Sequence, residues 1–103
     1  MGNLPEVVSM TMQTDVSSTY LAASGAVTGA PARLKSLVVR GDGTGGYVKF
    51  RDGSVSGTVL LQVDLGTADT QTFSVLLPGE GVRFPTSIYA DISHAAALTT
   101  FWA

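Results

Sequence analysis

The chain has few of the side chains that most enzymes and metalloproteins depend on. Its 103 residues include one histidine (His94), no cysteine, six basic residues and eight acidic residues. The absence of cysteine excludes disulfides and thiol nucleophiles, and a catalytic zinc site usually takes two or three histidines. A formal net charge of −2 provides no field that would gather a polyanion. We therefore expect no metal site, no cofactor and no nucleic-acid partner.

Long apolar runs and a basic leader are also missing. No apolar stretch approaches the ~20 residues that span a bilayer, and the opening residues 1–6 show no basic segment followed by an apolar run. We expect no membrane association and no signal peptide. Charged residues make up 14% of the chain, against ~25% in typical soluble domains. This shortage is typical of a surface that is buried against copies of itself or against a larger assembly.

The pattern that is present is short alternation of apolar and polar residues, cut by glycine and proline. In 47–51, for example, Val48 and Phe50 fall on one face, because successive strand side chains point to opposite faces. Seven or eight short strands at a spacing of about ten residues predict an all-β sandwich or barrel. We favour a single small antiparallel β-sandwich of the jelly-roll type. Its strand-like segments are 19–23, 32–40, 47–51, 58–65, 71–77, 82–84, 87–92 and 97–102, and a further strand-like segment, 7–12, precedes them.

Two segments give more specific expectations. Segment 32–40 is apolar on both faces, with Leu34 and Val38 buried and Leu37 and Val39 candidates for burial, which predicts a central strand covered on both sides. Segment 71–77 places Phe73, Val75 and Leu77 in one register. We divide the chain into an N-terminal strand or arm at 1–19 and a sandwich domain at 20–103.

The glycine-rich segment 41–46, GDGTGG, matches the string G-x-G-x-x-G. The dinucleotide-binding motif needs this string between a strand and a helix, so that phosphate lies at the helix amino terminus. Here a strand-like segment follows, which indicates a hairpin turn instead. Asp52-Gly53, at the end of an alternating run, is a second hairpin signal, because glycine adopts positive φ without penalty.

No group of residues shows the pattern of a catalytic site or a metal site. His94 has Asp91 and Ser93 nearby, but a triad needs three groups that converge in space, and a histidine beside three alanines favours a surface position. Asp42, Asp52, Asp64 and Asp69 fit no calcium-binding loop, which leaves a weak calcium site at an interface as the minority interpretation. We predict no catalytic, cofactor-binding or metal-binding residues, and hence no enzyme.

The aromatic residues allow two interpretations. Exposed aromatics on a β-sandwich can bind sugars, and Tyr20, Tyr47, Tyr89 and Trp102 are the candidates. We favour instead a subunit contact, where tyrosine is enriched. A terminal strand ending in Phe101 and Trp102 must be anchored, because chain ends otherwise fray; core packing is the default expectation for Trp102. The predicted interface residues are Val7, Val8, Met10, Met12, Tyr47, Tyr89, Phe101 and Trp102.

Six segments carry a family pattern: 22–27 (AASGAV), 31–37 (PARLKSL), 48–53 (VKFRDG), 56–61 (SGTVLL), 77–84 (LPGEGVRF) and 88–90 (IYA). In these segments the chain resembles a family of small proteins of tailed bacteriophages. The family is frequent in phages of marine bacteria and cyanobacteria, where its genes lie among virion genes. The similarity spans about 20–103 and consists mainly of turns and core strands.

This resemblance implies a virion structural protein made in the host bacterial cytoplasm. The favoured role is that of a capsid decoration (cement) protein, which binds the outer shell and stabilises it. Its partners would be the major capsid protein or other virion proteins, and copies of itself in a dimer or trimer. Residues 1–19 would serve as a contact arm. Two alternatives stay open: an accessory protein of the tail or neck, and a carbohydrate-binding module for weak adsorption to the host surface.

Overall fold

The computed structural model describes residues 16–67 and 70–103, and within them all regular structure is β. The predicted all-β class is therefore confirmed. The strand-like segment 7–12 lies outside the described residues. The strands are β1 (Ser17–Leu21), β2 (Gly25–Ala26), β3 (Ala32–Gly41), β4 (Thr44–Asp52), β5 (Val59–Thr67), β6 (Thr72–Leu76), β7 (Val82–Phe84), β8 (Ile88–Ser93) and β9 (Ala95–Trp102).

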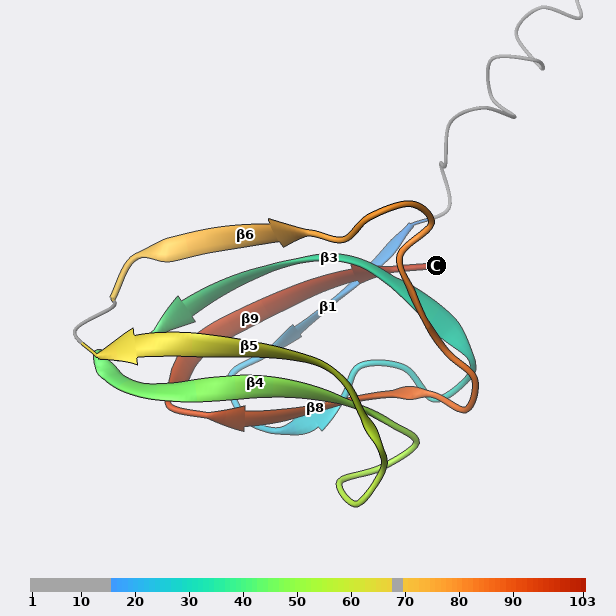
Figure 1. The fold of residues 1–103 in the computed structure, drawn as a ribbon, viewed down its shortest axis with the longest axis horizontal. Coiled ribbons are helices and arrows are strands. Elements are labelled where there is room, and N and C mark those ends of the chain that lie inside the picture. Colours follow the sequence, from blue (N-terminus) through green and yellow to red (C-terminus); the bar gives the residue numbers. More distant parts are fainter. Residues whose placement is uncertain (1–15, 68–69) are drawn as a thin grey trace, which may run out of the picture.

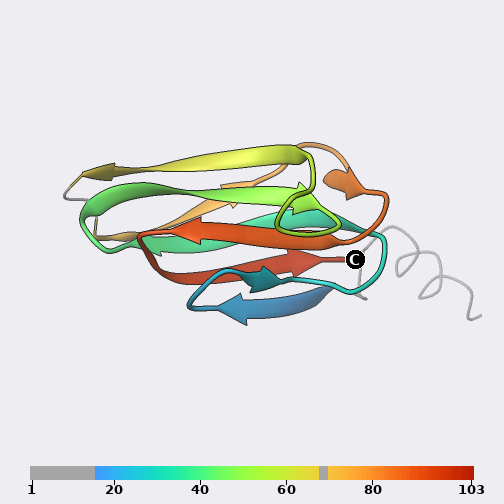
Figure 2. The ribbon, with the colours of Figure 1, turned by 90° about the horizontal axis from the view of Figure 1, so that it is seen from below.

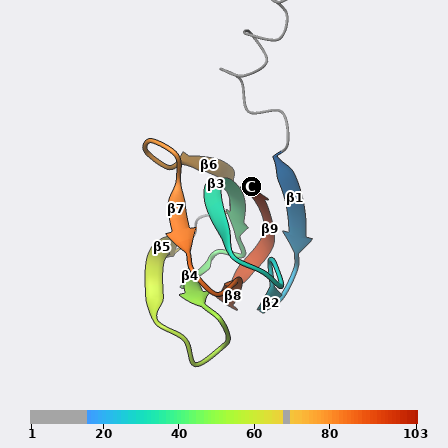
Figure 3. The same ribbon diagram turned by 90° about the vertical axis from the view of Figure 1, so that its right-hand side faces the viewer.

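Two antiparallel sheets lie face to face (Figure 1). Sheet A has the order β1-β9-β3-β6, with β7 also paired to β3, and sheet B has the order β2-β8-β4-β5. Figure 3 shows the two layers, with β7, β3 and β9 on one side and β5, β4 and β8 on the other. With β7 set aside, this strand order is that of a jelly roll, built from two Greek keys. The predicted sandwich is confirmed.

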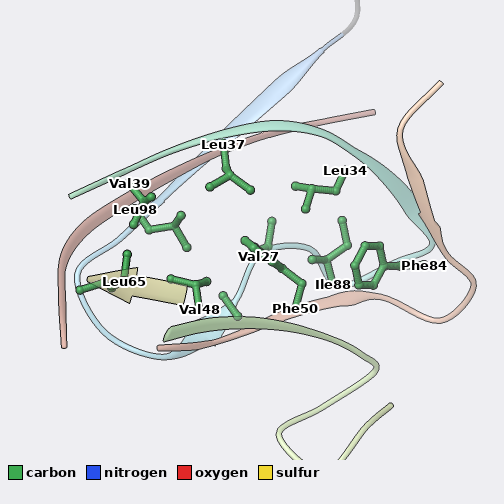
Figure 4. Close-up of a cluster of buried hydrophobic side chains, with 12 residues drawn as sticks. Val27, Leu34, Leu37, Val39, Val48, Phe50, Leu65, Phe84, Ile88 and Leu98 are labelled. Carbon is green, nitrogen blue, oxygen red and sulfur yellow. The ribbon is translucent and has the colours of Figure 1, made fainter. Parts of the chain in front are cut away.

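The core fills the space between the inner faces of the sheets (Figure 4). Val48 and Phe50 are both fully buried there, as their shared parity predicted. Phe73, Val75 and Leu77 pack against the same cluster and are partly buried, which confirms their common register. The buried apolar residues are Val27, Leu34, Leu37, Val39, Val48, Phe50, Leu65, Phe84, Ile88, Ala90, Ala95 and Leu98.

Strand β3 is central in sheet A, as expected, but only one of its faces is covered. Leu34, Leu37 and Val39 are fully buried, whereas Val38 points to the opposite side and is half-buried. The register of β3 against β9 shifts between Leu34 and Ser36, and a bulge of this kind turns residues three apart toward the same face. The expectation of cover on both sides is therefore wrong for the described residues of a single chain.

The two glycine turns have different roles. Asp52-Gly53 begins the loop that joins the paired strands β4 and β5, and Gly53 has a φ of 96°. The predicted hairpin is thus confirmed. Segment 41–46 instead connects β3 of sheet A to β4 of sheet B, so it is a corner between sheets and not a hairpin. A strand follows it, as predicted, and not the helix that a dinucleotide site needs.

Both ends of the described chain are held in sheet A. Strand β1 begins at Ser17, so the sandwich includes the last residues of the segment assigned to the arm. Thr19 fixes this strand, because its Oγ1 donates to the Val27 carbonyl at 3.0 Å and accepts from Trp102 Nε1 at 3.0 Å. At the other end, the backbone of Ala103 exchanges two hydrogen bonds with Arg33. The terminal strand is anchored as predicted, and Trp102 packs against the core.

Candidate interaction surfaces

The outer face of sheet A, which consists of the side chains directed away from sheet B, carries large apolar residues. Leu76 is 83% exposed and Tyr20 is 62% exposed. The register aligns Ser18, Phe101, Ser36 and Leu76 in one row across β1, β9, β3 and β6, and Tyr20, Thr99, Val38 and Ser74 in the next. Leu76, Phe101, Val38 and Tyr20 thus spread over the whole width of the sheet. We call these four side chains the apolar strip of sheet A; they alternate with serine and threonine residues, and no described strand lies over them.

Basic residues surround this strip. The strands of sheet A contain Arg33, Lys35, Arg40 and Arg83 and no acidic residue. Lys35 forms an ion pair with Glu80 at 3.3 Å. No ion pair joins the three arginines to another described residue. Arg33 and Arg83 lie directly opposite each other in the β3–β7 pairing, an arrangement of like charges that destabilises a sheet.

The outer face of sheet B is different, because its charged groups contact one another. Arg51 Nη2 lies 3.1 Å from Asp91 Oδ2, and both side chains are about one-fifth exposed. The Lys49 ammonium lies 4.4 Å from the centroid of the Tyr47 ring, within the range of a cation–π contact. Gln62 Nε2 donates to Asp64 Oδ1 at 2.7 Å. This face has the polar, internally paired character of a surface in contact with water.

The structure separates the aromatic residues that were considered for a sugar platform. Tyr47 and Tyr89 are on sheet B, but Tyr47 pairs with Ser93, four residues along β8 from Tyr89. At about 3.3 Å per residue, the backbone positions of the two tyrosines are about 13 Å apart along the strand direction. Tyr20 is on the outer face of sheet A, and Trp102 packs against the core. The four aromatic residues therefore do not form one platform.

The predicted interface residues are distributed over several regions. Phe101 is half-buried on the outer face of sheet A, and Tyr47 and Tyr89 are half-buried on that of sheet B. Val7, Val8, Met10 and Met12 lie outside the described residues. Sequence reasoning missed Leu76, Val38 and the facing Arg33 and Arg83. The available signal was segment 32–40, which is apolar on both faces and also carries three basic residues.

His94 forms a surface contact with Asp42 and not a triad. Its Nδ1 lies 3.4 Å from Asp42 Oδ2, and both side chains are substantially exposed. A hydrogen bond from the Thr44 backbone N–H is the main cause that lowers the pKa of Asp42 below its usual value, with His94 adding to the effect. His94 also has a positive φ of 60° at the turn between β8 and β9. This pair joins the turn between β8 and β9 to the segment between β3 and β4.

The described residues contain no group of three or more histidine, cysteine, aspartate or glutamate side chains arranged to hold a metal ion. They also include no helix of the length and apolarity that a membrane span requires. Comparisons of the chain with protein-family models, with curated proteins and with solved structures find no significant match.

Proposed function

We propose that this chain is a structural protein of a phage virion, a decoration protein that binds the outer surface of the capsid shell and stabilises it. The observation that carries the proposal is the outer face of sheet A. It combines an exposed apolar strip with arginines that have no acidic partner among the described residues. Such a face is typical of a surface that binds another protein. The resemblance to small phage proteins supplies the virion as the setting.

The charge pattern indicates the chemistry of the partner. Arg33 and Arg83 lie opposite each other and repel in the single chain. A carboxylate placed between them would accept charge-assisted hydrogen bonds from both guanidinium groups. The partner surface would therefore present acidic residues around an apolar centre. Major capsid protein subunits, or other virion proteins at the same position, are the proposed partners.

A capsid shell that binds many copies of this chain gains a small stabilising free energy from each of them. A leucine side chain that passes from water to a packed interface contributes about 1.5–3 kcal/mol, and Leu76 is almost fully available for this. Many identical contacts over a shell stabilise it although each is modest, because the subunits already held in place raise the effective concentration of the next contact. This function needs no catalytic residue and no cofactor.

The proposal is tested by adding the purified protein to expanded capsids that lack it and measuring the bound fraction by co-sedimentation. Leu76→Asp should weaken binding at least about tenfold, the equivalent of 1.4 kcal/mol. Val55→Asp is the matched control, because Val55 is also an exposed apolar residue, at 59%, but lies in the β4–β5 loop. Raising the salt concentration should weaken binding of the unaltered chain through its arginines. Equal binding of both variants would contradict the proposal.

A further inference from the structure

Strand β5 forms a long, open margin of sheet B. It pairs with β4 along one side and with no other strand among the described residues, and Figure 2 shows it at the limit of the sheet. β5 has nine residues, whereas β2 at the opposite margin of the sheet has two. Natural edge strands are protected by shortness, proline, lysine, β-bulges or a covering segment. The one bulge of β5 is at Leu60, near the start of the strand. β5 contains no proline and no lysine, and Asp64 is its single charged residue.

The side chains of β5 are also incompletely covered. Leu61 and Val63 pair with Phe50 and Val48 and face the core, yet both are only half-buried. Val59 and Leu60, at the start of the strand, are 37% and 39% exposed. The third core-facing residue, Leu65, is buried, so the incomplete cover is confined to the first part of the strand. A neighbour on this margin would complete the burial of that part and pair the free backbone groups.

We infer that β5 pairs antiparallel with β5 of a second copy, about a twofold axis at Val63. Val63 is the midpoint of residues 61–65, the part of β5 that pairs with β4 without interruption after the bulge at Leu60. The axis places Gln62 opposite the partner's Asp64, where amide and carboxylate form a hydrogen bond. It also places Leu61 opposite the partner's Leu65, so that apolar residues meet on the core side.

Charge and closure both favour a second copy as the occupant. In the single chain, Gln62 donates to Asp64 on the exposed face; in the dimer, the same two groups would form this hydrogen bond across the axis instead. No two aspartates face each other in this register, which avoids repulsion between like charges. The joined sheet would have only the two-residue β2 at each margin. Because each copy contributes the same strand, the contact is isologous, and two copies satisfy it.

Because the chain contains no cysteine, single cysteines can report the register. Residues directly opposite in an antiparallel pair have Cα atoms about 4.5–5.5 Å apart, a distance that a disulfide spans. Mixing Gln62→Cys with Asp64→Cys under mild oxidation should give a mixed disulfide, identified by mass, faster than either variant dimerises alone. Ser74→Cys, on β6 of sheet A, is the control and should remain reduced. Equal rates at all positions would overturn the inference.

Charge variants give an independent test on the full chain by sedimentation equilibrium. The unaltered chain should dimerise reversibly. Gln62→Glu should weaken the dimer at least about tenfold, because two carboxylates then face each other twice across the axis. Gln62→Lys should keep or strengthen it, because lysine faces the partner's Asp64. A chain that is monomeric at about 100 µM, or a Gln62→Lys variant weakened as much as Gln62→Glu, would contradict the pairing. These results are independent of capsid binding.

Discussion

Replacing Phe50 with alanine tests how well the sandwich core is packed. The Phe50 side chain is fully buried near the end of β4, where Phe50 pairs with Leu61 of β5 and Ala90 of β8. Figure 4 shows its ring among the core side chains. Its removal loses the transfer free energy of the ring and leaves a cavity that two sheets held by their ladders cannot close. Substitutions of this kind cost about 3–5 kcal/mol. We expect Phe50→Ala to lower the free energy of unfolding by that amount.

The assay is equilibrium unfolding in urea, followed by circular dichroism. With an m-value of about 1–3 kcal/mol per molar urea, the midpoint should fall by at least about 1 M, with m unchanged. Phe73→Ala is the matched comparison, because the Phe73 ring packs on the same core but is only partly buried. It should cost less, about 1–2 kcal/mol. A cost below about 1 kcal/mol for Phe50→Ala would refute the packing described here, because it would place the ring at the surface.

Three further predictions concern other parts of the chain. Gly46→Ala should cost about 1–3 kcal/mol in urea unfolding, because the added Cβ would collide with the Ser93 carbonyl oxygen; Gly29→Ala, where nothing lies within 4 Å, should be nearly neutral, and equal costs would contradict this. The Thr44 hydrogen bond lowers the pKa of Asp42, so its contribution to stability is complete above pH 3.8 and declines as the pH falls through the lower folded value. Asp42→Asn should therefore reduce the loss of stability on acidification below pH 3.8. If the variant loses as much stability as the unaltered chain in this range, the hydrogen bond does not hold Asp42 in its charged form. Millimolar calcium should leave the melting temperature unchanged, and a rise would indicate an aspartate site.

Much of the fold could be predicted from the sequence. The alternation of apolar and polar residues and the glycine turns are local signals, and they determine where each strand begins and ends. The segments that became β3 to β9 were each predicted as strands, and the burial of Val48 and Phe50 followed from their parity. β2 was missed because its two residues, Gly25 and Ala26, carry no strand pattern; they pair with Tyr89 and Ala90 through tertiary context. The sequence of segment 41–46 predicts a hairpin, whereas the structure has a corner between the sheets. A turn sequence does not show which sheet the next strand joins.

The surfaces were less accessible, because they depend on register between distant strands. The opposition of Arg33 and Arg83 arises from β3 and β7, fifty residues apart in the sequence. Leu76 and Tyr20 come from opposite margins of sheet A. Segment 32–40 did contain the relevant signal, since it is apolar on both faces. The inner face packs on sheet B, and the outer face, with Val38, is the one we assign to a partner.

The most direct test of the proposed function is the number of copies of this chain in each phage particle. Density-gradient fractions of an infected-cell lysate would be quantified for this chain against the major capsid protein. The account predicts a ratio near one, or a simple fraction such as about one-third, in DNA-filled heads. Only about a dozen copies would assign the chain to the neck or tail instead. Absence from the particles would contradict the virion role.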